Sequence, residues 1–465
     1  GKLKVGTYNQ SIDSTHAGND VGNYTITLGT ANSYAVTAKA ITYDITTGTI
    51  VYGNTDSAGA ITYSALVAGD SVSATAQINS RLLSTAVKLK VGTYSQSING
   101  THAGNDVGNY TITLGPANSY AVTAKATTIS GITAANKTYD GTTAASIDVS
   151  AANFSDKIGG DTLTVSATGT FADKTAEANK LVTLVETLGG ADLANYSVTL
   201  QSTSTASIAR KATSVSGITA ANKTYDGATT ASITVSAANF SDQIGGDTLT
   251  VSATGTFANK NVADNKAVSF TNIVYGGADY ANYSITDQAG TTANISQLNS
   301  VTWTGASSDG NWFTAGNWAN NAIPDLSNVA TSVIGSGNNV TFNYDNGTTT
   351  SLITNNGQFT FSGTDDLSFS NTISGSGALV KAGVNTLTLS GHNTYTGATT
   401  ISAGKLTSGM ANVIADSSAV SIANGATWDL ADFNETVASI ADVASNTTGS
   451  ISLGSANLTV GDASS

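Results

Sequence analysis

Apolar and polar residues alternate with a period of two along most of this chain. In the run DTLTVSATGTF at 161–171, Leu163, Val165 and Ala167 fall on one side, and the Thr and Ser residues between them fall on the other. Successive side chains of a β-strand point to opposite faces, so this alternation is typical of a half-buried strand. Asp-Gly and Gly-Gly-Asp turn signals separate such runs. The pattern predicts an all-β protein.

The pattern also repeats, with a period of 86 residues over roughly the first 298 positions. Residues 3–40 recur at 89–126, and residues 127–174 recur at 213–260. Each copy carries an Asn-Tyr pair, and the tyrosines are spaced by 86, 86 and 87 residues: Tyr24, Tyr110, Tyr196 and Tyr283. A fixed period of this kind indicates a serial array of similar units. Because these tyrosines recur beside apolar strand positions, we expect them to pack in a core or at a strand corner.

The period sets the expected domain organisation. We predict a partial β domain at 1–40, β domains at 41–126, 127–212 and 213–298, and a different final domain at 299–465. Each repeated unit is expected to be a small antiparallel β domain, either a sandwich or a β-grasp-like fold. Since the first unit lacks its N-terminal half, we expect the sequence to be an internal part of a longer protein.

After residue 298 the period stops and a Trp-rich segment, VTWTGASSDGNWFTAGNW, appears at 301–318. Short apolar runs divided by Gly and Asn follow, as in 367–406. Such short strands suit a parallel β-solenoid whose coils of about 20 residues stack at ~4.8 Å. The predicted fold is therefore tandem small antiparallel β domains followed by a parallel β-solenoid.

Composition narrows the function classes. Charged residues make up only 11% of the chain and the formal net charge is −13, which argues against nucleic acid and anionic membranes as partners. There is no Cys, so disulfides, thiol nucleophiles and Cys-ligated metals are excluded. No stretch approaches the ~18 apolar residues of a membrane span, so we expect no membrane insertion by this segment.

Candidate catalytic chemistry is sparse. The three histidines are His16 and His102, which occupy the same position in two repeats, and His392. Repeated His in a duplicated scaffold is better explained as a tolerated surface residue than as a catalytic or metal-binding group. No Gly-x-Ser-x-Gly elbow, phosphate loop or His-Glu-x-x-His motif occurs. We therefore expect a protein that is not an enzyme and that needs no cofactor.

Calcium is the one metal that the residues suggest. Four aspartates lie in Gly-rich turns at matching places of two repeats: Asp140, Asp161, Asp226 and Asp247. Oxygen ligands suit calcium, although Asp before or after Gly is first of all a turn former. No metal is our main expectation, and calcium at these residues is the alternative.

Two further features allow a functional and a structural interpretation. Trp303, Trp312 and Trp318 could stack on sugar rings, but we favour a cap over the first solenoid coil. Asn-x-Ser/Thr sites occur at Asn136, Asn195, Asn222 and Asn282; they follow mostly from composition, and surface glycosylation stays open.

Several segments resemble known families. The Lys-Thr-Tyr-Asp-Gly runs at 137–141 and 223–227 resemble YDG domains of large bacterial exoproteins, and the units ending at 40 and 126 look like the related MBG domains. Residues 371–406 are similar to the autotransporter-associated β-strand repeat, and the Trp segment resembles what often precedes it. The resemblance implies a large Gram-negative surface adhesin of the filamentous-haemagglutinin or autotransporter kind.

We therefore expect the stalk of a secreted or outer-membrane-associated adhesin, which acts in adhesion, aggregation or biofilm formation by extending a binding region from the cell. Expected partners are host or neighbouring-cell surfaces, glycans or copies of itself. Two alternatives remain open: a self-assembling extracellular filament or matrix protein, and a glycan-binding module that uses the segment from Trp303 to Trp318.

Overall fold

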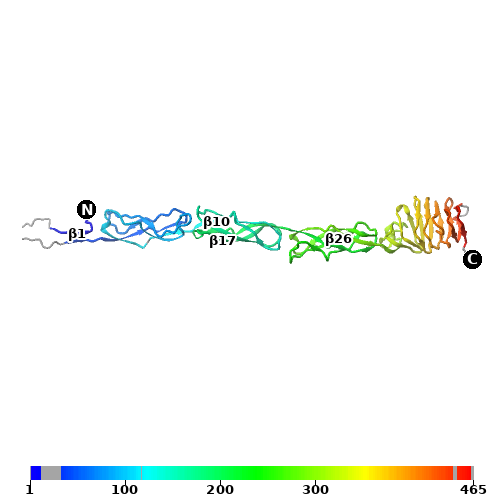
Figure 1. Cartoon of the computed structure of the whole chain (residues 1–465), viewed down its shortest axis with the longest axis horizontal. Coiled ribbons are helices and arrows are strands. Elements are labelled where there is room, and N and C mark those ends of the chain that lie inside the picture. Colours follow the sequence, from blue (N-terminus) through cyan, green and yellow to red (C-terminus); the bar gives the residue numbers. More distant parts are fainter. Residues whose placement is uncertain (1, 12–32, 117, 444–447, 462–465) are drawn as a thin grey trace, which may run out of the picture. The chain divides into compact units, whose positions relative to one another are not determined.

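The computed structural model describes residues 2–11, 33–116, 118–443 and 448–461, and its chain divides into two compact units, 1–211 and 212–465. Sheets with antiparallel hairpins dominate the repeats, and purely parallel sheets follow in the C-terminal region (Figure 1). This confirms the predicted all-β class and the change to a parallel solenoid. In the described part of the chain, no helix is long and apolar enough to cross a membrane.

The first unit contains two complete repeats, which we call bead 1 and bead 2. A short antiparallel pair, β1 (Gly6–Asn9) and β2 (Ser33–Val36), precedes bead 1. Bead 1 has one sheet in the order β5-β3-β8 and a second in the order β4-β9-β7-β6. The strand bounds are β3 Lys39–Ile45, β4 Gly48–Val51, β5 Ile61–Tyr63, β6 Ala76–Ile78, β7 Gly92–Ile98, β8 Tyr110–Leu114 and β9 Ser119–Thr123.

Bead 2 keeps this plan and extends it. Its sheets have the strand orders β15-β10-β18 and β12-β19-β17-β16-β13. A third, small sheet consists of β11 and β14. The bounds are β10 Lys125–Ser130, β11 Thr133–Ala134, β12 Lys137–Thr138, β13 Ala144–Ala145, β14 Ile147–Asp148, β15 Asn153–Phe154, β16 Thr164–Phe171, β17 Glu177–Gly189, β18 Tyr196–Thr199 and β19 Thr203–Ala209.

The second unit begins with bead 3, which repeats the strand order of bead 2 as β25-β20-β28, β21-β24 and β22-β29-β27-β26-β23. The bounds are β20 Lys211–Ser216, β21 Thr219–Ala220, β22 Lys223–Thr224, β23 Thr230–Ala231, β24 Ile233–Thr234, β25 Asn239–Phe240, β26 Thr250–Phe257, β27 Ala263–Gly276, β28 Tyr283–Thr286 and β29 Thr291–Ser296.

The beads are not purely antiparallel. In bead 1, β3 pairs with β8 and β4 pairs with β9, and both pairs are parallel. The hairpins β16-β17 and β26-β27 are antiparallel. Alternation in the sequence identifies strands but carries no information about which strand lies beside which, so the parallel pairs were not predicted.

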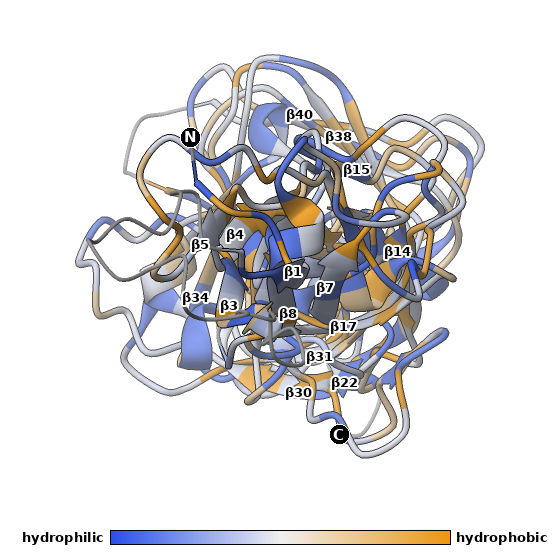
Figure 2. Ribbon diagram, turned by 90° about the vertical axis from the view of Figure 1, so that its left-hand side faces the viewer, coloured by the Kyte–Doolittle hydropathy of each residue, from blue (hydrophilic) through white to orange (hydrophobic). Residues whose placement is uncertain are grey.

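Alternating strands bury one face of each sheet. Val182 and Leu184 of β17 are buried, whereas Leu181 and Val185, which flank them, are exposed. Figure 2 shows short hydrophobic stretches interrupted by hydrophilic ones along the ribbon. The hydrophobic clusters join neighbouring modules: one includes residues of beads 1 and 2, and a larger one extends from bead 3 into the solenoid.

The solenoid starts at β30 (Leu298–Thr302) and is built from three parallel sheets, ordered β30-β31-β33-β36, β32-β34-β37-β39-β41-β44 and β35-β38-β40-β42-β45, with a last pair β43-β46. Phe359 pairs with Leu379, and Leu379 pairs with Thr399, so one coil takes 20 residues here, as predicted. The inward Phe359 and Leu379 are fully buried and stack from coil to coil.

The remaining solenoid strands are β31 Val329–Ile334, β32 Asn339–Asn343, β33 Leu352–Asn355, β34 Gln358–Ser362, β35 Leu367–Phe369, β36 Ile373–Ser374, β37 Ala378–Lys381, β38 Thr386–Leu389, β39 Thr399–Ile401, β40 Lys405–Ser408, β41 Ala419–Ile422, β42 Thr427–Asp429, β43 Glu435–Val437, β44 Ser439–Asp442, β45 Ser450–Ser452 and β46 Leu458–Val460.

Candidate functional site: the junctions between modules

Buried polar side chains of neighbouring modules meet where one module joins the next. At the junction of bead 1 and bead 2, Asp161 of bead 2 is only 4% exposed. Its Oδ2 accepts hydrogen bonds from the hydroxyl of Tyr52 in bead 1 at 2.6 Å and from that of Tyr196 in bead 2 at 2.7 Å. Its Oδ1 accepts the backbone N–H of Ala86 at 3.2 Å. A buried carboxylate with three donors is thus shared by two beads.

Both tyrosines are held as neutral donors. Burial raises the pKa of Tyr196 to about 12, and its hydrogen bond to Asp161 acts in the same direction. Burial and the same carboxylate also raise the pKa of Tyr52. The two rings meet edge to face with centroids 5.4 Å apart, a favourable aromatic geometry. The junction therefore combines an apolar contact with a charge-assisted hydrogen bond.

A second contact of this junction comes from the turn Asp192-Leu-Ala-Asn195. Thr85 of bead 1 donates its hydroxyl to Asp192 Oδ2 at 2.5 Å and its N–H to Oδ1 at 3.2 Å. Val91 of bead 1 donates its N–H to Asn195 Oδ1 at 3.0 Å. Burial opposes ionisation of Asp192, but hydrogen bonds from Thr162 and Thr85 outweigh it and hold the pKa below its ordinary value.

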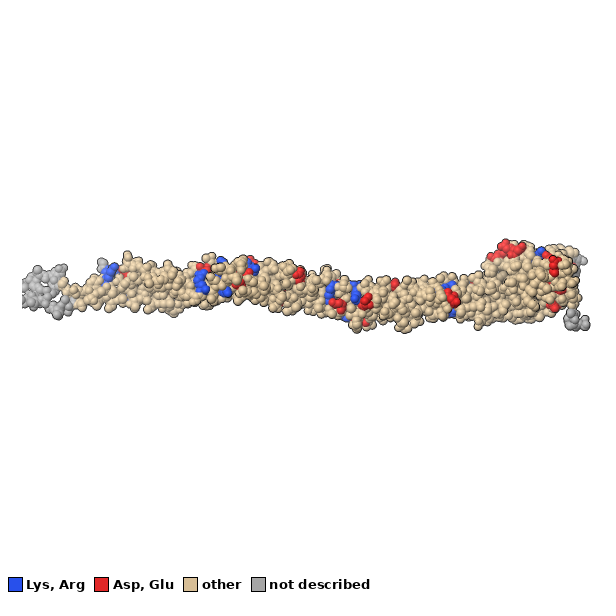
Figure 3. All heavy atoms as spheres, in the orientation of Figure 1, with Lys and Arg blue, Asp and Glu red and all other residues tan. Residues whose placement is uncertain are grey.

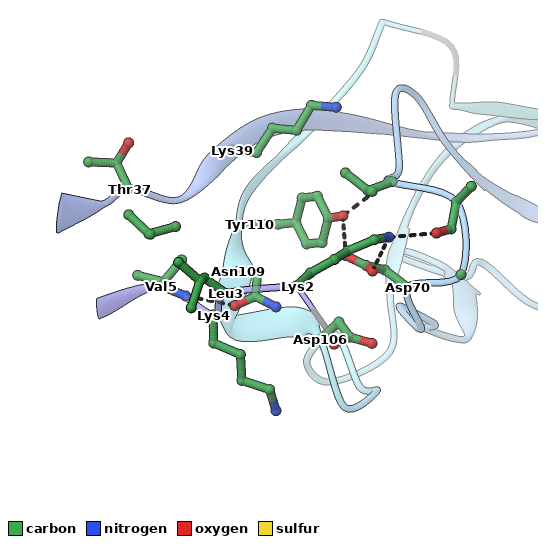
Figure 4. A pocket seen from close by; sticks show the side chains of 14 residues that line it. Lys2, Leu3, Lys4, Val5, Thr37, Lys39, Asp70, Asp106, Asn109 and Tyr110 are labelled. Carbon is green, nitrogen blue, oxygen red and sulfur yellow. Dashed lines mark hydrogen bonds and ion pairs between the residues drawn. The ribbon is translucent and has the colours of Figure 1, made fainter. Parts of the chain in front are cut away.

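The same arrangement precedes bead 1 (Figure 4). Tyr110 donates to Asp70 Oδ2 at 2.6 Å, and the Lys2 ammonium lies 2.9 Å from Asp70 Oδ1. The N–H of Val5 donates to Asn109 Oδ1 at 2.9 Å, as that of Val91 does to Asn195. The hydrogen bond from Tyr110 and then that from Lys2 hold the pKa of Asp70 below its ordinary value.

Bead 3 joins the solenoid through equivalent groups. The Tyr225 hydroxyl donates to Asp325 Oδ1 at 3.3 Å and to the carbonyl of Ile323 at 3.1 Å, and Lys260 pairs with Asp325 at 2.9 Å. The N–H of Val262 donates to Asn328 Oδ1 at 2.8 Å. The solenoid thus begins with the same acceptors that a bead presents, although its fold is different.

The Lys-Thr-Tyr-Asp-Gly turn positions this tyrosine. Lys223 pairs with Asp226 at 2.7 Å, and Asp226 accepts the N–H of Ala228 at 2.9 Å, which closes the turn. Gly227 has φ +74°, and a Cβ there would lie 2.5 Å from the carbonyl oxygen of Asn321 in the solenoid segment. The glycine therefore allows both the left-handed turn and the close approach.

The four candidate calcium ligands lie in two kinds of site, and protein groups donate to each of them. Asp140 and Asp226 pair with Lys137 and Lys223 inside the Tyr-Asp-Gly turns. Asp161 accepts Tyr196, and Asp247 accepts Tyr283 at 2.7 Å. Within the described ranges, no three His, Asp or Glu side chains gather in a group that could hold a metal ion.

The tryptophans lie in a core. Trp303, Trp312 and Trp318 are 5%, 0% and 2% exposed, and Trp318 packs edge to face between the other two. Trp312 also contacts Phe342 and Phe359 of the first coils, with centroids 5.4 and 5.5 Å away. The ring faces on which a sugar would stack are therefore covered by protein side chains.

One histidine differs from the expectation. His102 is half-buried rather than a surface residue, with Nδ1 2.9 Å from the Tyr63 hydroxyl and its ring against Tyr43, and burial lowers its pKa. His16 and Tyr24 lie outside the described residues, and His392 is exposed.

The Asn-x-Ser/Thr sites also have structural roles. Asn195 and Asn282 are buried in the turns that precede Tyr196 and Tyr283. The side-chain oxygens of Asn136 and Asn222 accept the backbone N–H groups of Ser207 and Asn294. These bonds explain the asparagines without any attached sugar.

Sequence reasoning identified the recurring tyrosines as packing residues and missed the turn before them. In the described part of the chain, Asp-x-x-Asn precedes a strand at four places, and in each the Asn N–H bonds back to the Asp carbonyl. These turns are 106–109, 192–195, 279–282 and 325–328. We call them DxxN turns. Their recurrence inside and outside the 86-residue period was the available signal.

Comparison with known proteins agrees with part of the predicted resemblance. Residues 123–206 and 209–293 match the model of the YDG domain, and residues 379–407 match that of the passenger-associated-transport repeat. These matches are consistent with an autotransporter passenger. The search of curated proteins and that of solved structures found no match. The resemblance of residues 41–126 to MBG domains stays a prediction.

Proposed function

We propose that this chain is a spacer segment of a Gram-negative surface adhesin that reaches the cell exterior as part of an autotransporter-type passenger. Its role is mechanical and spatial: beads and solenoid hold a binding region away from the cell. Neither catalysis nor a cofactor belongs to this role. The YDG-domain and passenger-associated-transport-repeat matches support the class of protein.

The reuse of one junction carries the proposal. Val5, Val91 and Val262 each donate a backbone N–H to the Asn of the next module, across three junctions that otherwise differ. A serial array depends on such a constant contact. When the joining groups stay the same, a further module can be added without a change to the cores of its neighbours. An enzyme would instead concentrate its unusual polar groups in one site.

The surface supports an extracellular role. The face shown in Figure 3 is mostly uncharged, and Lys, Arg, Asp and Glu are confined to a few small groups. With 11% charged residues and a net charge of −13, the chain gains solubility from hydroxyl and amide groups, and its negative charge disfavours adsorption to an anionic cell surface. The burial of the three tryptophans gives no support to the glycan-binding alternative.

Antibody labelling of intact cells that express the parent gene tests the proposal. We expect antibodies against residues 39–209 to label unpermeabilised cells, and an in-frame deletion of residues 127–212 to keep that labelling while reducing cell adhesion or aggregation. Deletion of one whole period preserves the type of junction, since the offsets are 86 residues. Labelling only after permeabilisation would overturn the proposal.

A further inference from the structure

Each bead contains two extended runs that lie side by side and point in the same direction. In bead 2 the incoming run, 125–138, holds β10 and β12, and the outgoing run, 196–209, holds β18 and β19. Lys125 pairs with Tyr196 at one end, and Thr138 pairs with Ala209 at the other. Both pairs are parallel and their offset is 71 residues, so the two runs advance in step and in the same direction.

Side-chain amides join the runs where strand pairing is interrupted. Gln201 accepts the N–H of Ile132 at 3.0 Å and donates to its carbonyl at 2.7 Å, as a strand residue would. Asn136 accepts the N–H of Ser207 at 2.6 Å. These side chains connect the two runs in the gap between the paired strands β10-β18 and β12-β19. We call the continuous contact between runs 125–138 and 196–209 the seam.

Bead 3 has the same seam. Gln288 accepts the N–H of Ile218 at 2.9 Å and donates to its carbonyl at 2.8 Å, and Asn222 accepts the N–H of Asn294 at 2.7 Å. In bead 1 the strands themselves cover more of the seam, with five residue pairs in β3-β8 and four in β4-β9. The seam is therefore a property of all three described beads.

The direction of the seam decides how a bead responds to tension. The chain enters bead 2 at the start of the incoming run and leaves it at the end of the outgoing run. A pull on the chain drags these parallel runs in opposite directions along their own length, so the seam hydrogen bonds are loaded together. If the same runs were separated sideways at one end, the bonds would break one after another.

We propose that the beads are tension-bearing modules, in which the parallel seam resists forced unfolding along the chain. This goes beyond a spacer role, since a spacer has only to occupy length. An adhesin between two moving surfaces carries load, and the rate of forced unfolding then decides its lifetime.

Single-molecule pulling on the full chain tests this in two geometries. Because the sequence has no Cys, pairs of exposed alanines can be replaced to give defined attachment points. Ala126→Cys with Ala209→Cys loads the seam of bead 2 lengthwise. Ala126→Cys with Ala194→Cys separates the runs from one end. We expect a several-fold higher unfolding force in the first geometry.

Gln201→Ala adds a second comparison. We expect this substitution to lower the unfolding force when the seam is loaded lengthwise, and to change the unfolding force little when the runs are separated from one end. Thr175→Ala is the matched control, because it removes the hydroxyl that donates to Asp173 and accepts from Lys180, and neither of these bonds joins the two runs. Equal forces in the two geometries, or an equal loss in both on Gln201→Ala, would overturn the tension-bearing role and leave the spacer role standing. The geometry comparison needs no seam variant to fold.

Discussion

At the scale of single residues, the junction carboxylates accept hydrogen bonds from several donors, whereas the carboxylate of Glu186 in bead 2 lacks a well-formed hydrogen bond. Glu186 of β17 points to the inner face of its sheet, where bead 3 has Ile273 in a hydrophobic cluster. Its carboxylate oxygens are buried, and the backbone N–H of Gln201 approaches them without a well-formed hydrogen bond. Burial raises the pKa of Glu186.

This predicts that Glu186→Ile stabilises bead 2. At pH 7 the unfolding free energy of bead 2 should rise by about 1 to 3 kcal/mol, the usual cost of an unsatisfied buried polar group. Because the folded pKa of Glu186 is raised above its ordinary value of 4.5, wild-type bead 2 should become more stable as the pH falls toward 4.5. Hydrogen exchange of β17 amides measures both effects.

The matched control is Thr187→Ile, at the next and exposed position of the same strand. It adds an equal side chain outside the core and should change the exchange rates little. A variant Glu186→Ile that is no more stable than wild type, or that keeps the pH dependence, would show that this carboxylate is not the cause.

Asp192 predicts the opposite pH response for the junction. Its folded pKa lies below the ordinary value of 3.8, so its contribution is present above pH 3.8 and is lost as the pH falls through the folded pKa. The Thr85 amide, which donates to Asp192, should therefore exchange disproportionately fast in acid. Asp192→Asn should abolish this acid step, and an acid step that persists in the variant would refute the assignment.

At the scale of elements, the Tyr-Asp-Gly turn joins a local conformation to a contact with the next module. Gly227 has φ +74°, and a Cβ placed there would lie 2.5 Å from the carbonyl oxygen of Asn321. Gly425 has a similar φ of +75°, but no heavy atom lies within 4 Å of the position that a Cβ would take. Substitutions at these two glycines can therefore distinguish the cost of a left-handed backbone from the cost of a disturbed junction contact.

Replacing either glycine by Ala should cost about 1 kcal/mol through the left-handed backbone, and Gly227→Ala should cost more because it also displaces the solenoid segment. The four tryptophans all lie between residues 303 and 428, so their fluorescence reports on the second unit. We expect the urea midpoint to fall further for Gly227→Ala than for Gly425→Ala. Equal shifts would mean that the contact contributes nothing.

Sequence patterns predicted the elements well where the signal is local. The alternation at 161–171 corresponds to β16, Thr164–Phe171. The one spacing of 87 residues also has a structural cause, because β27 carries an irregularity near Asn272, whose φ is +51°. A β-bulge absorbs the extra residue without shifting the alternation of the strand.

The pairing of strands and the use of the aspartates could not be predicted. Parallel partners such as Lys125 and Tyr196 are 71 residues apart, and period-two alternation is the same whichever neighbour a strand has. The sequence around Asp161 suggests a turn former or a calcium ligand, whereas its role as an acceptor depends on Tyr52, which lies 109 residues earlier in another bead. Only the three-dimensional junction shows which donors an acidic side chain receives.

At the scale of the whole molecule, the stability of each module depends on its own contacts and on its junctions with its neighbours. Two hydrophobic clusters cross junctions: one includes Tyr52 of bead 1 and Tyr196 of bead 2, and a larger one extends from Tyr225 of bead 3 into the solenoid. In a one-dimensional array, a junction residue should affect the two modules that share it and leave distant ones unchanged.

Hydrogen exchange along the full chain with Tyr52→Phe tests this central claim most directly. The substitution removes only the hydroxyl that Asp161 accepts, and Tyr280→Phe, at a 49% exposed side chain, is the control. We predict faster exchange in the bead 1 segment 84–91 and around Asp161, with bead 3 and the solenoid unchanged. Exchange that stays unchanged at the junction, or that rises throughout the chain, would contradict an array of modules joined by this contact.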